Sequence, residues 1–245
     1  MSTDFSVIGS YIFPIETYLT DFQGRITLTT WGNYLLHAAT LHADKHGFGY
    51  DCMQKHRRAW VLSRLAMEMY EYPLAGDDLE IQTWVEEVNK LFTLRNFAFK
   101  IRGKEIGYAR SVWASIDLET RRPGNIFELG NIVDYVVDNN CPIERVSKIK
   151  SLGEGDSIEQ YKVKYSDLDI NKHVNSVKYI EHIIDLFPLE VLKERSIKRF
   201  EIVYINESHY GDKWNMRQQQ IETNTYVVEL KNEQSETICR SKIIF

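Results

Sequence analysis

Acid, amide and imidazole side chains alternate in one short stretch of the second half of the chain. Asp167, Asp169, Asn171, His173 and Asn175 occupy every second position. Because alternate side chains of an extended segment point the same way, this spacing predicts that the groups converge. A carboxylate can activate water, while an amide and an imidazole can orient it or donate hydrogen bonds, so the cluster indicates acid–base chemistry.

An amphipathic helix is predicted directly after this cluster. Apolar residues from Val174 to Phe187 fall three or four positions apart, and polar residues take the opposite side. Asn175 is suited to cap the helix start, and Pro188 closes it. A polar cluster would then lie at a helix N-terminus, where free N–H groups favour negative charge. The alternative is a helix start with ordinary capping residues.

Composition and charge narrow the class of protein. A formal net charge of −5 argues against general nucleic-acid binding. Cys52, Cys141 and Cys239 have no metal-ligand spacing and fit a reducing compartment. The histidines form no H-E-x-x-H pattern, so we expect no metal and no cofactor. Without a signal-like N-terminus or a membrane-spanning apolar run, we expect a soluble, cytoplasmic protein.

The same order of elements is predicted twice: a strand, a helix, then four strands. A turn-rich linker covers Glu119–Gly155 and holds a short ordered piece around Ile132–Val137. This divides the chain into residues 1–150 and 151–245, an α+β arrangement in which each helix buries its apolar stripe against a curved sheet. The predicted elements of the first half are Phe5–Tyr18, Thr27–His46, Trp60–Tyr70, Leu79–Val88, Leu91–Arg102 and Ile106–Leu118; those of the second half are Ile158–Tyr165, the helix from Asn175, Ile197–Ile205, Trp214–Glu222, Tyr226–Leu230 and Thr237–Phe245.

The stretch from Asp167 to Tyr179 resembles the signature of acyl-acyl carrier protein thioesterases of the plant-plastid and bacterial type. That family carries Asp-Leu-Asp-x-Asn-x-His-Val-Asn-Asn-x-Lys-Tyr, and here Ser176 replaces the second Asn. The resemblance extends into the first half, through Trp60–Arg64, Thr83–Val85 and Ser111–Trp113. It implies two tandem hotdog domains, each a long helix wrapped by a curved antiparallel sheet. It also implies an acyl carrier protein bearing the substrate as partner, and it leaves a homodimer open.

The resemblance adds residues beyond the motif. In Glu201–Asp212, Glu207 matches the family's catalytic-network glutamate and Ser208 its cysteine. A serine needs an activating base, and no Gly-x-Ser-x-Gly pattern is present, so we predict direct hydrolysis without an acyl-enzyme.

Each residue of the motif then has an expected role. Asp169 and Glu207 would share the activation of a water molecule, and Asn171 would orient it. His173 would donate to the thioester carbonyl or to the departing thiolate. The helix N-terminus near Asn175 would polarise the carbonyl.

The first half has no comparable polar motif, so we expect it to provide walls for the acyl chain. Trp31, Leu35, Ala38 and Ala39 combine large and small residues on the first helix and would leave room for a methylene chain, although simple core packing accounts for them equally. Three alternative functions remain at this stage. These are an acyl-coenzyme A thioesterase, a hotdog hydratase or dehydratase (disfavoured by the position of His173), and a non-catalytic acyl-binding module in which Ser208 marks a dead site.

Overall fold

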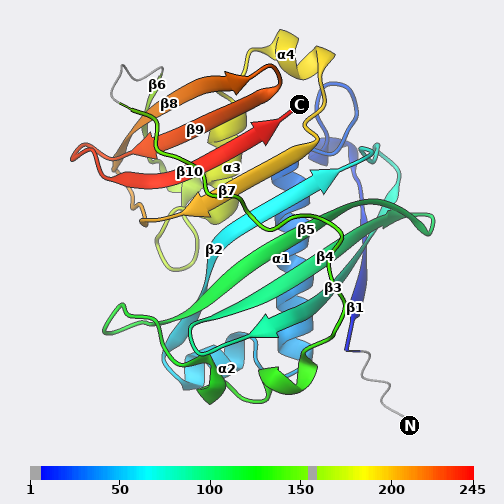
Figure 1. Ribbon diagram of the computed structural model, residues 1–245, viewed down its shortest axis with the longest axis vertical. Coiled ribbons are helices and arrows are strands. Elements are labelled where there is room, and N and C mark those ends of the chain that lie inside the picture. Colours follow the sequence, from blue (N-terminus) through cyan, green and yellow to red (C-terminus); the bar gives the residue numbers. More distant parts are fainter. Residues whose placement is uncertain (1–6, 154–158) are drawn as a thin grey trace. The chain divides into compact units, whose positions relative to one another are not determined.

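The computed structural model describes residues 7–153 and 159–245 (Figure 1). The chain forms two compact units. Unit 1 comprises Met1–Ser63 and Tyr70–Glu144, and unit 2 comprises Arg64–Met69 and Arg145–Phe245. One strand, β2 (Arg58–Met69), is therefore divided between them. None of the helices in the described ranges is both long and apolar enough to cross a membrane.

Unit 1 is a curved sheet with one long helix behind it. Its strands run in the order β1-β3-β4-β5-β2, and the pairs β1–β3, β3–β4 and β4–β5 are antiparallel. Figure 1 shows helix α1 crossing behind these strands. The bounds are β1 Gly9–Pro14, α1 Leu28–Lys45, α2 Tyr50–Lys55, β3 Asp78–Val88, β4 Phe92–Ile101 and β5 Lys104–Asp117.

Helix α1 forms where its sequence predicts. Thr27 caps it, because the Thr27 side chain accepts a hydrogen bond from the Thr30 backbone N–H at 3.1 Å. Its buried face packs against β1 and β3. His42 is fully buried there and contacts Arg95 at 3.1 Å, so it is a residue of the core. Burial and the Arg95 charge lower the pKa of His42 to about 3, so its imidazole is neutral.

Unit 2 repeats this architecture with a shorter helix. Its strands run in the order β7-β10-β9-β8-β6, all in antiparallel pairs, and β7 also pairs with Arg64–Glu68 of β2. Helix α3 buries Val177, Ile180 and Ile183. The bounds are β6 Glu159–Lys162, α3 Ser176–Ile184, α4 Leu189–Glu194, β7 Arg199–Tyr204, β8 Lys213–Glu222, β9 Thr225–Lys231 and β10 Thr237–Ile244.

The predicted α+β pattern of a strand, a helix and four strands is thus confirmed in both halves. Two short helices, α2 and α4, were not predicted. Short 3₁₀ turns add to these elements at Thr17–Leu19, Ile126–Glu128, Ile132–Tyr135 and Tyr165–Asp167, the second and third of them inside the predicted linker. Parts of three predicted segments (residues 5–6, 154–155 and 158) lie outside the described residues.

Two buried glutamates hold residues 145–153, the segment that leads into the second half of the chain. On β7, Glu201 accepts hydrogen bonds from the Ser147 backbone N–H at 2.8 Å and from the Ser147 hydroxyl at 2.6 Å. Arg199 donates to the same carboxylate at 2.6 Å, which neutralises it. Burial acts to raise the pKa of Glu201, but the hydrogen bonds from Ser147 and Arg199 outweigh it and the pKa is lowered.

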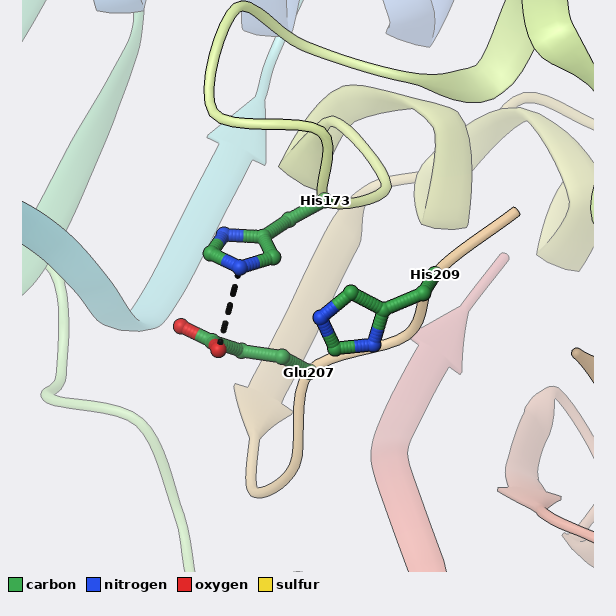
Figure 2. A group of neighbouring side chains, drawn as sticks. All are labelled: His173, Glu207 and His209. Atoms are coloured by element: carbon green, nitrogen blue, oxygen red, sulfur yellow. Dashed lines mark ion pairs between the residues drawn. The ribbon is translucent and has the colours of Figure 1, made fainter. Parts of the chain in front are cut away.

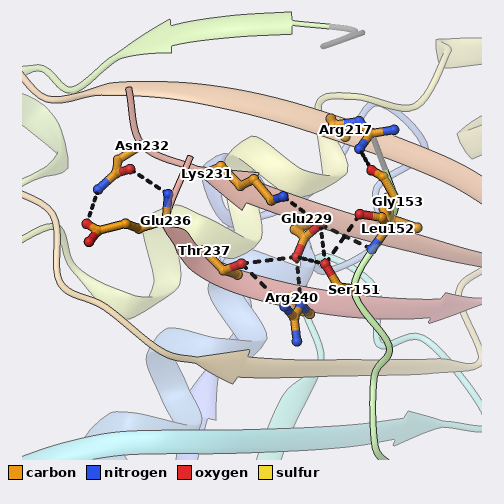
Figure 3. Close-up of polar contacts among 10 residues, drawn as sticks. All are labelled: Ser151, Leu152, Gly153, Arg217, Glu229, Lys231, Asn232, Glu236, Thr237 and Arg240. Carbon is orange, nitrogen blue, oxygen red and sulfur yellow. Dashed lines mark hydrogen bonds and ion pairs between the residues drawn. The ribbon is translucent and has the colours of Figure 1, made fainter. Parts of the chain in front are cut away.

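Glu229 on β9 does the same further along the segment (Figure 3). Its carboxylate accepts from the Ser151 hydroxyl at 2.9 Å, the Leu152 backbone N–H at 3.1 Å and Arg240 Nε at 2.7 Å. Its side chain is fully buried. Burial acts to raise the pKa of Glu229, and the bonds from Arg240 and Ser151 again lower it overall. The segment before residue 154 is therefore fixed to the sheet of unit 2 by ionised carboxylates.

Candidate active site

The motif segment is not extended, and the prediction that its alternate side chains converge is wrong. It begins as a 3₁₀ turn over Tyr165–Asp167 and then folds back, so that Leu168 bridges Val174. Lys172 takes a left-handed backbone conformation with φ of 65°. Aspartate side chains close these turns by accepting backbone N–H groups, which competes with an extended strand.

Asp167 fixes the segment to the rest of unit 2. Its carboxylate is buried and accepts from the Tyr161 hydroxyl at 2.8 Å, the Lys164 backbone N–H at 2.7 Å and His182 Nε2 at 3.1 Å. Burial acts to raise the pKa of Asp167, but these hydrogen bonds outweigh it, so the pKa is lowered and the group is ionised. With its oxygens occupied in this way, Asp167 has a structural role.

Asp169 shapes the turn that carries His173. Its Oδ1 accepts the backbone N–H of Asn171 at 2.8 Å and of His173 at 3.1 Å. Its own N–H donates to the His173 carbonyl at 2.8 Å. These three contacts tie both ends of the turn together and leave Asn171 exposed at its tip. Asp169 therefore positions His173 through the backbone.

His173 and Glu207 are the two predicted site residues whose reactive groups meet. His173 Nε2 lies 3.5 Å from Glu207 Oε2, and about a quarter and a third of the two side chains are exposed (23% and 36%). Figure 2 shows both side chains turned toward one another from separate segments. A carboxylate beside an imidazole, both reachable by solvent, can remove a proton from water and pass one on.

His209, which was not predicted as a site residue, joins this pair. The His173 and His209 rings are 5.0 Å apart and nearly perpendicular, and the two residues form a β-bridge. One ring nitrogen of His209 faces His173 and Glu207 in Figure 2. The available signal was spacing, since Glu207 and His209 are two residues apart and in extended chain lie on the same side.

Ser208 points away from this group, into the core of unit 2. Only 1% of the residue is exposed, and its hydroxyl accepts a hydrogen bond from Trp214 Nε1 at 3.0 Å. Tyr179 stacks on Trp214, and burial raises the pKa of the Tyr179 hydroxyl. The Ser208 carbonyl accepts the Val174 N–H at 2.9 Å. The structure thus gives Ser208 a packing role that anchors the motif segment.

Asn175 caps α3 as predicted. Its side-chain Oδ1 accepts the Val177 N–H at 3.0 Å, and its own N–H donates to the Asp167 carbonyl at 2.8 Å. The cap therefore takes up one of the N–H groups that we expected to face a substrate carbonyl.

The residues predicted to line an acyl pocket lie together on the buried face of α1. Trp31, Leu35 and Ala38 are fully buried, and Ala39 is 6% exposed. Trp31 packs edge-on against Phe99 at 5.1 Å between ring centroids. This is the packing of a core helix, and the pocket assignment stays a prediction.

In each unit one helix lies against a curved antiparallel sheet, which is the hotdog architecture that the sequence predicted twice. The model of the acyl-ACP thioesterase N-terminal domain matches residues 10–131, and that of the acyl-ACP thioesterase C-terminal domain matches residues 150–245. The chain therefore belongs to the acyl-ACP thioesterase family.

Individual relatives agree with this family. The crystal structure of an acyl-ACP thioesterase from Bacteroides thetaiotaomicron is 48% identical, with a TM-score of 0.93 and 98% of each chain covered. An oleoyl-acyl carrier protein thioesterase of Arabidopsis thaliana, a chloroplastic protein, is 29% identical over 224 residues, covering 82% of this chain and 59% of the relative. The 12:0-ACP thioesterase of Umbellularia californica shares the fold, with a TM-score of 0.88 at 19% identity. The chain spans about 60% of the length of the first curated relatives it matches.

Proposed function

We propose that this chain hydrolyses the thioester of fatty acyl-acyl carrier protein, releasing a free fatty acid and the carrier-protein thiol. Family membership supports the substrate class. The observation that carries the reaction is the 3.5 Å contact between His173 Nε2 and Glu207 Oε2 at a solvent-reachable position. In this proposal the reaction runs in the cytoplasm as part of fatty acid biosynthesis, which agrees with Cys52, Cys141 and Cys239 forming no disulfide in the described structure.

The chemistry needs one proton acceptor and one donor. Glu207 takes a proton from water as the water oxygen bonds to the thioester carbonyl carbon. The C–S bond then breaks, and His173 passes a proton to the departing thiolate. The contact between the two side chains allows the proton held by Glu207 to replace the one that His173 gives up. Atoms and charges balance without a covalent intermediate.

The remaining predicted residues support this pair. Asp169 positions His173 through the two backbone N–H groups it accepts. In the proposal, the exposed Asn171 amide orients the water or the thioester. Asn175 fixes the start of α3 behind the motif. Ser208 takes no part in bond-making, because its hydroxyl is buried against Trp214. The acyl chain is assigned to the region of Trp31, Leu35, Ala38 and Ala39, as the sequence predicted.

Thiol release from defined substrates tests this proposal. Purified protein is incubated with acyl-carrier protein and with acyl-coenzyme A of matched chain length, and both the free thiol and the free fatty acid are quantified. The thiol is detected with a thiol-reactive dye, which can also react with the protein's own cysteines. Measuring the free fatty acid as well distinguishes turnover from that side reaction. Faster thiol release from acyl-carrier protein supports the proposal. Faster release from acyl-coenzyme A contradicts the assignment of acyl-carrier protein as the substrate. Water addition to an enoyl chain, or binding without turnover, would replace the thioesterase function with one of the alternatives.

A further inference from the structure

The side chains of His173, Glu207 and His209 form a cluster of metal-ligating groups. One ligand atom from each lies within 4.8 Å of the others. The three come from two segments separated by α3, α4 and β7, so no single sequence motif contains the whole cluster. Two imidazoles and one carboxylate are a ligand set that zinc uses when it keeps an open coordination position.

We propose that His173, Glu207 and His209 bind one divalent transition-metal ion of the zinc class, and that bound metal inhibits hydrolysis. The binding stands on this geometry alone, whereas the inhibition rests on the proposed function. Zinc bonds to histidine nitrogen and carboxylate oxygen are about 2.0–2.2 Å, so tetrahedral ligand atoms lie about 3.3 Å apart. His173 Nε2 and Glu207 Oε2, at 3.5 Å, already have nearly this separation.

His209 needs only a small side-chain movement to complete the site. Its side chain is more than half exposed (58%), so it can turn without disturbing the core. Its backbone is held by a hydrogen bond from its N–H to Asp212 Oδ2 at 2.8 Å. The same oxygen lies 3.9 Å from His209 Nδ1, and the other ring nitrogen faces His173 and Glu207 (Figure 2). When the ring has turned to the metal, a hydrogen bond from Nδ1–H to this carboxylate would fix the ring and strengthen the metal bond.

A metal ion in this site would occupy the same side-chain groups that hydrolysis requires. Glu207 cannot take a proton from water while its carboxylate is a ligand, and His173 Nε2 cannot carry one to the thiolate. The loss of rate should therefore follow the fraction of protein that holds metal. Zinc would act as a reversible inhibitor, with a chelator restoring the full rate.

Calorimetric titration of the full chain with zinc chloride tests the binding. The parent protein carries Cys52→Ser, because Cys52 Sγ lies 3.8 Å from His56 Nδ1 and offers a competing zinc site in unit 1. We expect one ion per chain. Loss of a ligand in His209→Gln should raise the Kd at least about tenfold, and Asp212→Asn should raise it about 10–100-fold. His37→Gln, an equal change at an exposed histidine of unit 1, should leave the Kd unchanged. Thermal unfolding checks that each variant is folded.

Two results would overturn the site: no binding by the parent, or equal affinity in the parent and in His209→Gln. Hydrolysis is measured separately, first with a chelator and then across the zinc titration. If the zinc-free parent has no activity, the proposed function fails while the calorimetry still decides the site. If zinc saturates the site and the rate stays unchanged or rises, the inhibitory part is wrong.

Discussion

Replacing Ser208 by alanine should weaken folding and spare catalysis. Ser208 Oγ accepts a hydrogen bond from Trp214 Nε1 at 3.0 Å, and Trp214 has no exposed surface. Removing the hydroxyl leaves a buried donor unsatisfied, which costs about 1–3 kcal/mol. At about 2–4 °C per kcal/mol for a chain of this size, the Tm should fall by roughly 2–12 °C. Because the hydroxyl does not face His173 or Glu207, kcat measured well below the new Tm should stay near that of the parent.

A second serine provides the control for this experiment. Ser241 is equally buried, and its hydroxyl donates to the Glu201 carbonyl at 2.7 Å. Ser241→Ala should also lower the Tm without lowering kcat. A nucleophilic serine behaves differently, since its removal costs about 10⁶-fold in a serine hydrolase. A collapse of kcat in Ser208→Ala alone, or an acyl group trapped on Ser208, would refute the packing role and make this serine the nucleophile.

Three further predictions follow from the contacts of single residues. Asp169→Ala should lower kcat. Asp169→Asn, which still presents an oxygen to the two backbone N–H groups, should keep most of the parent kcat. Equal losses of about 10²–10⁴-fold in both variants would make Asp169 a general base. Stability measured by thermal unfolding should fall as the pH drops below 4.5, the ordinary pKa of a glutamate carboxyl. Glu229 has a lowered pKa in the folded state, so its contribution to stability is complete only above that pH. Glu229→Gln should make stability less dependent on pH in this acidic range. An unchanged pH dependence would contradict the stabilising role of the Glu229 carboxylate. Ala39→Phe should shorten the preferred acyl chain in a chain-length profile, and an unchanged profile in folded protein would remove the pocket from α1.

Much of the fold was predictable because local signals agreed with it. Thr27 and Asn175 both cap helices as their residue types indicate. The short helices α2 and α4 were missed because their boundaries carry signals that usually end a helix. Gly49 and Pro188 instead stand at the N-caps of new helices: glycine is a favoured cap, and proline is tolerated there because it has no N–H to leave unpaired.

The site was less predictable, because side-chain hydrogen bonds decide the backbone there. Alternation predicted an extended motif, but Asp169 captures two backbone N–H groups, and Lys172 adopts a conformation that no spacing rule indicates for lysine. The family resemblance added Glu207 to the residues of the motif, but we expected it to act with Asp169, and its contact with His173 came only from the structure. His209 was passed over because the resemblance assigned no role to it.

The rate of Glu207→Gln tests the central claim most directly. Acyl-carrier protein hydrolysis is compared between the parent, Glu207→Gln and Glu233→Gln, the last an exposed glutamate of unit 2 that pairs with Lys213. Glutamine keeps the shape of Glu207 but cannot take a proton, so kcat should fall about 10²–10⁴-fold while the Tm stays near that of the parent. Glu233→Gln should keep the parent rate. A folded Glu207→Gln variant with the parent kcat would contradict the assignment of the base, and with it the site at His173 and Glu207.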